Sequence, residues 1–415
     1  MFYRCWLLVL SAFLLFGRHA AVAQSDTLSS PSYKRPHVSR NQAIALTGER
    51  DIRDVFHKFF PQPVEVDKDT LSLSADRKFV WIIPAPGYTQ QTRGLVQLTG
   101  NVSYHEQDAN MSTLIAALSY TQNRQIIFTA ASSIWKAQNR INWVGDWRLM
   151  HYPQNTYGLG IHTSIDRPIA MDYEYLRFYQ SALFKVRPSF YAGLGYQLDY
   201  HWNIESRNKT QEVTSISDYS LGVKGHSISS GVAMTLLYDS RGNAINPERG
   251  FYTNLVLRPN LKLLGSDTNF QSLLLDVRKY LRVTDTGNVL AFWSYNALTL
   301  HGNPPFLDLP STGWDTYSSI GRGFIQGRFR GKDLLYGEAE YRFGITRNRL
   351  LGGVLFTNAQ AVSERVTHNF EKVVPAAGFG LRLSMNKISR TNLAVDYGFG
   401  ADGSRGLTFN LGEVF

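Results

Sequence analysis

The sequence predicts an all-β protein, a transmembrane antiparallel β-barrel of sixteen strands. Its 415 residues include 22 Tyr, 24 Phe, 8 Trp and 34 Gly, a mixture typical of barrels with aromatic girdles at both membrane interfaces. Many short segments alternate apolar and polar residues with a period of two, which gives a strand one lipid face and one wet face. Beyond residue 23, no apolar run approaches the ~20 residues of a spanning helix. A large soluble array of β-sandwiches is the alternative.

The first 23 residues predict a secretory signal peptide. Arg4 precedes an apolar stretch over residues 6–16, and small residues at 21–23 supply a cleavage site. We expect the mature chain to begin at Gln24 and to leave the cytoplasm. Its single cysteine, Cys5, lies in the part that is removed, so neither disulfides nor cysteine-based metal sites are expected.

Residues 24–76 are expected to form a short periplasmic or plug segment with one helix. The candidate helix is "ERDIRDVFHKFF". Its apolar side chains share one face: Ile52, Val55, Phe56 and Phe59. The expected domains are therefore the signal peptide at 1–23, this segment at 24–76 and an outer-membrane barrel at 77–415.

Sixteen segments have the alternation of a barrel strand, an even number as closed bacterial barrels have. They begin near residues 91, 111, 123, 139, 157, 171, 188, 225, 250, 267, 287, 333, 349, 372, 389 and 405. The predicted inner turns are short: "TQN", "KVRP", "TDTG", "GITRN" and "NKIS". The long polar segments fall on the outer side: 204–224, 301–332 and 361–371. Strand parity and loop length therefore support the same assignment.

The formal net charge of +10 accompanies neither a basic stripe on a helix nor a nucleic-acid-binding motif. We assign this charge to loops and the lumen, and expect no nucleic acid among the partners. The segment "GHSIS" at Gly225 lacks the final glycine of a nucleophile elbow, and the ten histidines are scattered singly. We therefore expect no enzyme activity, no cofactor and no metal, and an outer-membrane phospholipase is the weakest hypothesis.

The stretch "SSIGRGFIQGRFRGKDLLYGEAEYRFGI", residues 318–345, sets four arginines beside a strand with carboxylates. Its glycines follow GxGxxxG and precede a strand, whereas a dinucleotide-binding loop has GxGxxG between a strand and a helix. A phosphate-binding loop is therefore a poor fit. We expect the loop to fold back onto carboxylates of its own protein, beside the strand that carries Glu338, Glu340 and Arg342.

The inner turn "YDSRGNAINPERGFY" predicts a rigid connection between two strands. Asp239 and Arg241 are spaced to hydrogen-bond the backbone of the turn, Pro247 fixes its own φ angle, and Gly250 restarts a strand. We interpret these residues as a structural turn and not as a catalytic pair.

The chain ends "GLTFNLGEVF", a pattern that predicts a last strand with an aromatic end. We expect Leu407, Phe409, Leu411 and Phe415 on one face of this strand. An edge strand of this kind suits β-augmentation, in which an assembly machine pairs with the backbone and holds side chains in pockets. Phe409, Leu411 and Phe415 are thus the predicted signal for insertion by the host barrel-assembly machinery.

Together these features resemble the bacterial surface antigen family, the barrel domain of BamA- and TamA-type outer-membrane assembly factors. The resemblance rests on Asp-x-Arg followed by Pro-x-x-Gly-Phe, the Arg322-Gly323-Phe324 loop, "AEYRF" after it and the aromatic last strand, in that order. It covers residues from about 80 to 415. It implies sixteen strands and a long loop after the eleventh strand that folds into the lumen, which places residues 301–332 there.

The resemblance also implies a lock between this loop and the barrel wall. Arg322 corresponds to the lumenal arginine of the family, and Glu340 to the carboxylate that it pairs with. On the next strand, "FTNAQ" puts Asn358 where the family has an aspartate, and Asp396 is the candidate for the second carboxylate. The expected lock residues are Arg322, Gly323, Phe324, Glu340, Asn358 and Asp396.

The function implied by the resemblance is assembly or translocation of proteins at the bacterial outer membrane. A weak seam between the strands near 91 and 405 would template a client strand. The expected partners are outer-membrane lipids and unfolded outer-membrane or secreted clients. Such factors carry polypeptide-transport-associated domains, for which residues 24–76 are too few. A channel or a surface antigen without insertase activity is therefore the alternative.

Overall fold

The computed structural model describes residues 48–52, 54–55, 79–106, 109–316, 318–387 and 390–415. The predicted signal peptide and most of segment 24–76 lie outside these residues. Ile52, Asp54 and Val55 have helical backbone, and the rest of the expected helix falls outside the description. Within the described part of the chain, no helix is both long and apolar enough to cross a membrane.

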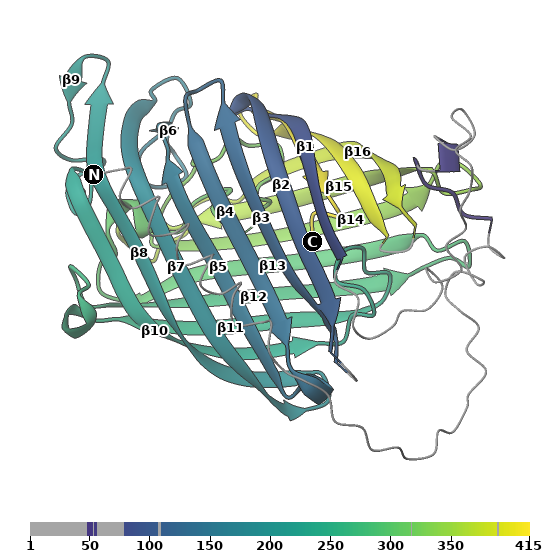
Figure 1. The fold of residues 1–415 in the computed structure, drawn as a ribbon. Coiled ribbons are helices and arrows are strands. Elements are labelled where there is room, and N and C mark those ends of the chain that lie inside the picture. Colours follow the sequence, from purple (N-terminus) through teal and green to yellow (C-terminus); the bar gives the residue numbers. More distant parts are fainter. Residues whose placement is uncertain (1–47, 53, 56–78, 107–108, 317, 388–389) are drawn as a thin grey trace. The chain divides into compact units, whose positions relative to one another are not determined.

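One antiparallel sheet curls into a nearly closed barrel, which confirms the predicted fold class (Figure 1). Sixteen of its strands form the wall, and the short strands β6 and β9 belong to loops. The strands are β1 (Phe79–Thr89), β2 (Arg93–His105), β3 (Met111–Thr121), β4 (Ile126–Trp135), β5 (Ile141–His151), β6 (Gln154–Thr156), β7 (Ile169–Arg187), β8 (Phe190–Asn208), β9 (Gln211–Glu212), β10 (Gly225–Asp239), β11 (Gly250–Asn260), β12 (Phe270–Arg282), β13 (Val289–His301), β14 (Asp333–Gly344), β15 (Leu351–Val362), β16 (Val374–Asn386), β17 (Thr391–Gly400) and β18 (Arg405–Leu411). Short 3-10 helices are η2 (Ala137–Asn139), η3 (Lys262–Leu264) and η4 (Phe306–Asp308).

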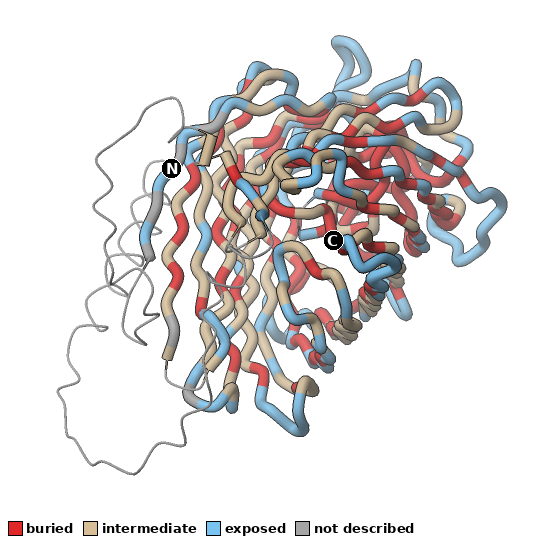
Figure 2. The backbone as a smooth tube through the Cα atoms, turned by 90° about the vertical axis from the view of Figure 1, so that its right-hand side faces the viewer, coloured by how far each residue is buried: buried red, intermediate tan, exposed pale blue. Residues whose placement is uncertain are grey.

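Alternation along each strand separates an inner face from an outer face. On β14, Tyr336, Glu338 and Glu340 are buried, whereas Leu335 and Gly337, which alternate with them, are exposed. Figure 2 shows the same alternation of buried and exposed residues along the wall. Because side chains of a strand point to opposite faces in turn, β14 directs its charged residues into the lumen.

The number of wall strands is as predicted, but two strand assignments were wrong. β1 lies where no strand was expected, and the segment near residue 157 is a loop. Pro84 and Pro86 explain the first error, because proline argues against a central strand and is confined to edge strands. The shift also moves the turn "TQN", residues 121–123, to the end of the barrel that carries the long connections.

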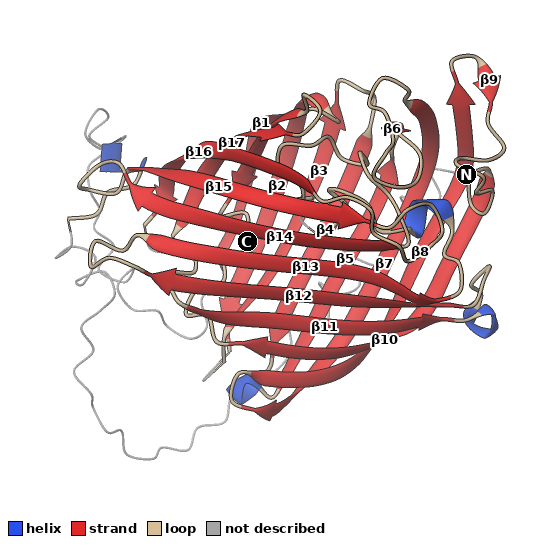
Figure 3. Cartoon of the chain, turned by 180° about the vertical axis from the view of Figure 1, so that it is seen from behind, coloured by secondary structure: helices blue, strands red, loops and turns tan. Residues whose placement is uncertain are grey.

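The connections gather at two ends of the barrel, seen from behind in Figure 3. The short-turn end carries the predicted turns "KVRP", "TDTG" and "GITRN", together with the start of β1 and the end of β18. The predicted turn "NKIS" falls between β16 and β17, and its last two residues, 388–389, lie outside the described residues. The long-loop end carries the connections between β5 and β7, β8 and β10, β13 and β14, and β15 and β16. The parity argument from the sequence therefore holds from β7 onward.

The first and last wall strands meet at a seam. β1 and β18 lie beside each other, yet no backbone hydrogen bond joins them among the described residues. Every other pair of neighbouring wall strands forms an antiparallel ladder. The seam therefore lies between β1 and β18, and the predicted seam beside the strand near residue 91 was wrong by one strand.

The connection between β13 and β14 packs inside the barrel. Its residues Ile320, Phe324 and Phe329 are buried in one apolar cluster with Trp293 and Tyr336, which face inward from the wall. Phe306, Leu307 and Leu309 of the same connection join a second cluster near β5, β7 and β8. The loop thus fills the lumen between two opposite parts of the wall.

Candidate functional site

The inward loop brings Arg322 against three carboxylates of the wall. Its Nη2 donates to Glu338 and Glu340 of β14, and its Nη1 donates to Asp396 of β17 at 2.8 Å. The arginine is 4% exposed and the carboxylates are buried as deeply. Since a guanidinium group offers donors in a fixed fork, it can bind carboxylates of two strands at once.

The glycines of this loop allow its backbone to lie close to the barrel wall. Gly321 and Gly323 have φ angles of +80° and +99°, which side-chain-bearing residues rarely adopt. A Cβ on Gly398 of β17 would lie 2.7 Å from the backbone nitrogen of Gly323, so the loop lies directly on the strand. The glycine pattern therefore positions Arg322 instead of holding a phosphate.

Two side chains of β15 support the loop from the same side. The ring of Phe356 lies 3.8 Å from the guanidinium carbon of Arg322, a cation–π contact. Asn358 donates from Nδ2 to the backbone oxygen of Arg322 at 3.0 Å. Asn358 therefore holds the backbone of the loop and not its charge. Phe324, the last residue of the expected lock, packs edge to face on Phe329.

The carboxylates also bind arginines of the wall. Arg342 donates from Nε to Glu340 at 2.6 Å, and Arg382 donates to Asp396 at 2.5 Å and to Glu413 at 2.7 Å. We call this group the Arg322 cluster: Arg322, Glu338, Glu340, Arg342, Arg382, Asp396 and Glu413. Burial alone would lower the pKa of Arg322, but the three carboxylates outweigh it and hold that pKa well above its usual range. The arginine therefore stays charged.

The chain end departs from the prediction. Phe409 and Leu411 are exposed on the outer face of β18, but Phe415 is only 3% exposed and lies in the lumen. β18 ends at Leu411, and Gly412 turns the backbone inward with a φ angle of +97°. Phe415 stacks on Trp293 with 5.1 Å between ring centroids. The sequence had predicted Phe415 on the face that carries Phe409. That prediction was wrong, because Phe415 lies in the lumen.

The structure brings the residues of the predicted inner turn together. Arg241 donates from its backbone and from Nε to Asp239 Oδ1, at 3.0 and 2.9 Å, and from Nη2 to Oδ2 at 2.8 Å. Gly250 has a φ angle of +118°, and a Cβ there would lie 2.8 Å from the oxygen of Ser240. Pro247 is buried in the same connection. The arrangement makes a stiff turn at the short-turn end.

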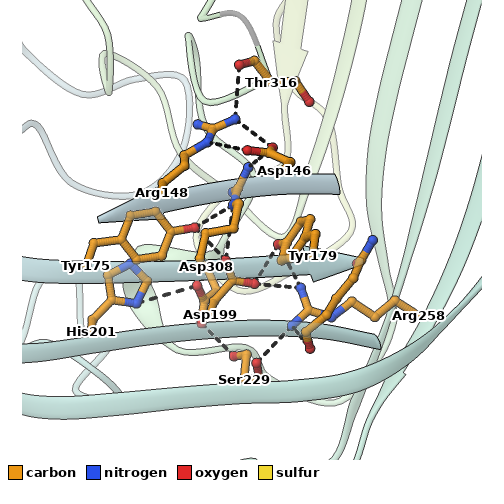
Figure 4. Close-up of polar contacts among 12 residues, drawn as sticks. Asp146, Arg148, Tyr175, Tyr179, Asp199, His201, Ser229, Arg258, Asp308 and Thr316 are labelled. Atoms are coloured by element: carbon orange, nitrogen blue, oxygen red, sulfur yellow. Dashed lines mark hydrogen bonds and ion pairs between the residues drawn. The ribbon is translucent and has the colours of Figure 1, made fainter. Parts of the chain in front are cut away.

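A second ionic group lies on the inner wall formed by β5, β7, β8 and β11 (Figure 4). Asp199 accepts hydrogen bonds from Arg258 at 2.6 Å, Tyr175 at 2.5 Å and Tyr179 at 2.6 Å. Next to it, Arg148 binds Asp146 through two bonds of 3.0 Å. We call this group the Arg258 cluster: Asp146, Arg148, Tyr175, Arg177, Tyr179, Asp199, His201 and Arg258.

The loop contacts the edge of the Arg258 cluster through the backbone of Thr316 and the side chain of Asp308. Arg148 donates to the backbone oxygen of Thr316 at 3.0 Å, and Ser229 donates to Asp308 at 2.5 Å. Asp308 Oδ1 lies 3.7 Å from Nδ1 of the buried His201. Burial, together with the nearby Asp199 carboxylate, raises the pKa of Asp308 to about 7. Asp308 therefore titrates near neutral pH.

Sequence analysis missed most of the Arg258 cluster and the wall arginine Arg382. Inward parity was the available signal, because Asp199 on β8 and Arg258 on β11, two strands separated by β10, both alternate with outward residues. One further group has possible metal-ligand geometry within the described residues: His162, Glu364 and Glu371, with ligand atoms within 4.8 Å of one another. Two of its three members are exposed, and Glu364 already accepts a bond from the backbone of Ile161.

Comparisons with known proteins agree with this geometry. The model of the Omp85 superfamily domain matches residues 89–415. BamA from Haemophilus ducreyi lacking POTRA domains 1–3 is similar at 14% identity, covering 80% of this chain and 69% of that chain, with a TM-score of 0.53. CdiB from Acinetobacter baumannii is similar at 12% identity, covering 81% and 60%, with a TM-score of 0.52. CdiB from Escherichia coli gives 11% identity, 81% and 68% coverage, and a TM-score of 0.50. No curated protein matches.

Proposed function

Because the chain belongs to the Omp85 superfamily, we propose that it assembles or translocates polypeptides at the bacterial outer membrane. In this proposal the signal peptide predicted at residues 1–23 directs export. Outer-membrane lipids surround the wall, and unfolded outer-membrane or secreted proteins are the clients. The chain acts by binding strands and not by catalysis.

The observation that carries the proposal is the seam. A strand edge with unpaired backbone groups is a template for another strand. Within the described part of the chain, β1 and β18 lie beside each other without a ladder, so each offers an unpaired edge toward the other. A client strand could pair with either edge while the rest of the barrel stays closed.

Two prolines keep this seam from closing along its whole length. β1 pairs with β2 from Phe79 to Thr89, and Pro84 and Pro86 lie within that span. Proline has no N–H group, so its nitrogen suits the side of a strand that lacks a partner. We infer that the β1 edge offers few donors near these prolines, which favours strand exchange over permanent pairing.

The filled lumen supports assembly over the alternative of an open channel. The loop residues Phe306, Ile320 and Phe329 are buried between the walls, and Arg322 fixes the loop to β14 and β17. An open pore requires this loop to leave the lumen. The purified barrel should therefore conduct poorly in planar bilayers, and high steady conductance would favour the channel.

Depletion of the protein in its native host tests the proposal. We expect the levels of a defined set of outer-membrane or secreted proteins to fall when the outer-membrane proteome is measured. A cysteine pair placed at facing positions of β1 and β18 should reproduce this loss when oxidised and reverse it when reduced. An unchanged proteome on depletion would refute the assembly function.

A further inference from the structure

A basic cavity lies at the short-turn end of the barrel, apart from the seam. Its volume is about 110 Å³, several times the ~10–15 Å³ that one water molecule needs. Its basic lining residues are Arg50, Arg342, Arg349, Arg382, Lys387 and Arg390. Its acidic lining residues are Glu49, Glu248 and Glu413. The cavity therefore has room for a small polar group and an excess of cationic side chains.

Arg342 lines this cavity with a hydrogen-bond donor that is not used. Its Nε donates to Glu340 at 2.6 Å and its Nη2 to the backbone oxygen of Phe415 at 2.9 Å. Its Nη1 is buried and has no hydrogen-bond partner among the described residues. The side chain is 7% exposed. A buried donor of a charged group without an acceptor costs free energy, so an acceptor at this place would be favourable.

The rim of the cavity carries more positive than negative charge. Arg390 lies 2.6 Å from Glu248, Arg282 lies 3.3 Å from it, and Arg349 lies 3.7 Å from it. Three guanidinium groups from three elements thus share one carboxylate. Each is about one-third exposed, so the rim is open to a ligand from solvent. The excess charge favours an anion beside Glu248.

We propose that this cavity, the inner-mouth site, binds a carboxylate group. The group belongs either to an acidic side chain of a polypeptide or to a small free carboxylic acid. It would accept from Arg342 Nη1 at the floor and from Arg349 and Arg390 at the rim. Planar carboxylates match the fork of a guanidinium group, and every anionic partner of these arginines in the structure is a carboxylate.

Two carboxylates of the chain itself, those of Asp51 and Asp54, already bind at the edge of the cavity. The backbone N–H of Lys387 donates to Asp51 at 3.0 Å, and Lys387 Nζ donates to both oxygens of Asp54 at 2.9 Å. These contacts leave Arg342, Arg349 and Arg390 among the residues that line the cavity. Among the described residues, none of β1 or β18 lines the cavity, although Glu413 follows β18 closely, so occupation of the site does not depend on the proposed function.

Calorimetry on the full chain in detergent tests the site with three probes. These are a hexapeptide that alternates glutamate and glycine, its glutamine counterpart, and succinate. We expect the glutamate peptide or succinate to bind and the glutamine peptide not to bind. Arg349→Gln and Arg390→Gln should each weaken binding about tenfold, because each removes a hydrogen bond between charged groups. Added salt should weaken binding as well, since the rim is exposed.

Two comparisons keep the test decisive. Arg207→Gln removes an exposed arginine paired with Glu205 at the long-loop end and should leave binding unchanged. Arg342→Gln should abolish binding in protein that still migrates as a folded barrel, and the rim variants decide the matter if that variant does not fold. Binding of succinate alone assigns the site to small acids, and binding of the peptide alone assigns it to polypeptides. Equal binding of both peptides, or binding of neither the glutamate peptide nor succinate, would overturn the proposal.

Discussion

The Arg322 cluster and the Arg258 cluster are both buried ion networks on the inner wall, but they differ in where their central cation comes from. In the first, the loop supplies Arg322 and the wall supplies the carboxylates. In the second, wall strands supply both Arg258 and Asp199, and the loop contacts the margin of the group through residues such as Thr316 and Asp308. The first network therefore joins loop to wall, whereas the second joins strand to strand.

This difference predicts two kinds of damage. Removing a partner from the Arg322 cluster should free the loop, because the loop loses its only charged anchor to β14 and β17 among the described residues. Removing a partner from the Arg258 cluster should loosen the wall and leave the loop in place. Trypsin distinguishes the two, since the loop carries Arg328, Arg330 and Lys332, which are all buried.

The largest expected effect is that of Arg322→Ala. It leaves three buried carboxylates with one cation fewer, and breaking a buried pair costs ~3–5 kcal/mol of unfolding free energy, less where water enters the lumen. We expect a lower melting temperature in detergent and rapid tryptic cleavage of the loop.

Arg322→Lys serves as the matched control for charge. A lysine keeps the charge but lacks the fork that reaches two strands, so we expect the loop to stay sensitive to trypsin. Full recovery of protease resistance by lysine would show that charge alone anchors the loop.

The next effect is that of Phe415→Ala, on the same side of the lumen. Truncating a buried phenylalanine typically costs ~3–5 kcal/mol, and the Phe415 ring stacks on Trp293. We expect a lower melting temperature of the folded barrel. Phe409→Ala, on the outer face, should instead lower membrane levels with little change in melting. Identical behaviour of the two variants would contradict the inward position of Phe415.

A smaller effect is expected for Arg258→Ala. Asp199 keeps Arg177 and the hydroxyls of Tyr175 and Tyr179, so we expect a loss of about 2 kcal/mol, the typical value of a hydrogen bond to a charged group. The melting temperature should fall while the loop resists trypsin. Release of the loop in this variant would remove the distinction between the two clusters.

The smallest effect concerns pH. The folded-state pKa of Asp308 is raised to about 7 from an ordinary value of 3.8. The folded protein therefore holds this proton more tightly, and the associated stability is complete below about pH 4 and is lost as pH rises through 7. We expect the η4 end of the loop to exchange amide hydrogens faster at pH 8 than at pH 6 after correction for intrinsic rates. Asp308→Asn should remove this difference, and a difference that persists in the variant would exclude Asp308 as its source.

The sequence predicted the fold class because that class rests on local pattern, whereas the place of the loop in the lumen was implied by the family resemblance. Alternation with a period of two is visible in any strand with one wet face, and strand parity located Asp396 on an inward face. β1 was missed because Pro84 and Pro86 argue against a strand unless its edge position is already known. No local pattern indicates that Gly412 turns Phe415 inward.

The Arg258 cluster escaped prediction for a different reason. Its members come from β5, β7, β8 and β11, so their contacts depend on the register between strands. Alternation alone places Asp199 and Arg258 on the inner face, but the sequence does not show which inward side chains of different strands lie opposite one another. Arg322 was predictable only because a family resemblance supplied the partner strand.

A double-mutant cycle on Arg322 and Glu340 tests most directly whether the inward loop is anchored by charge to the wall. Arg322→Ala, Glu340→Gln and the double variant are compared by the free energy of unfolding of the detergent-solubilised barrel. Side chains in contact within one ion network couple by about 0.5–3 kcal/mol, and we expect a value of at least about 1 kcal/mol. Effects that add to within ~0.3–0.5 kcal/mol would mean that the two side chains do not interact, and would contradict the account.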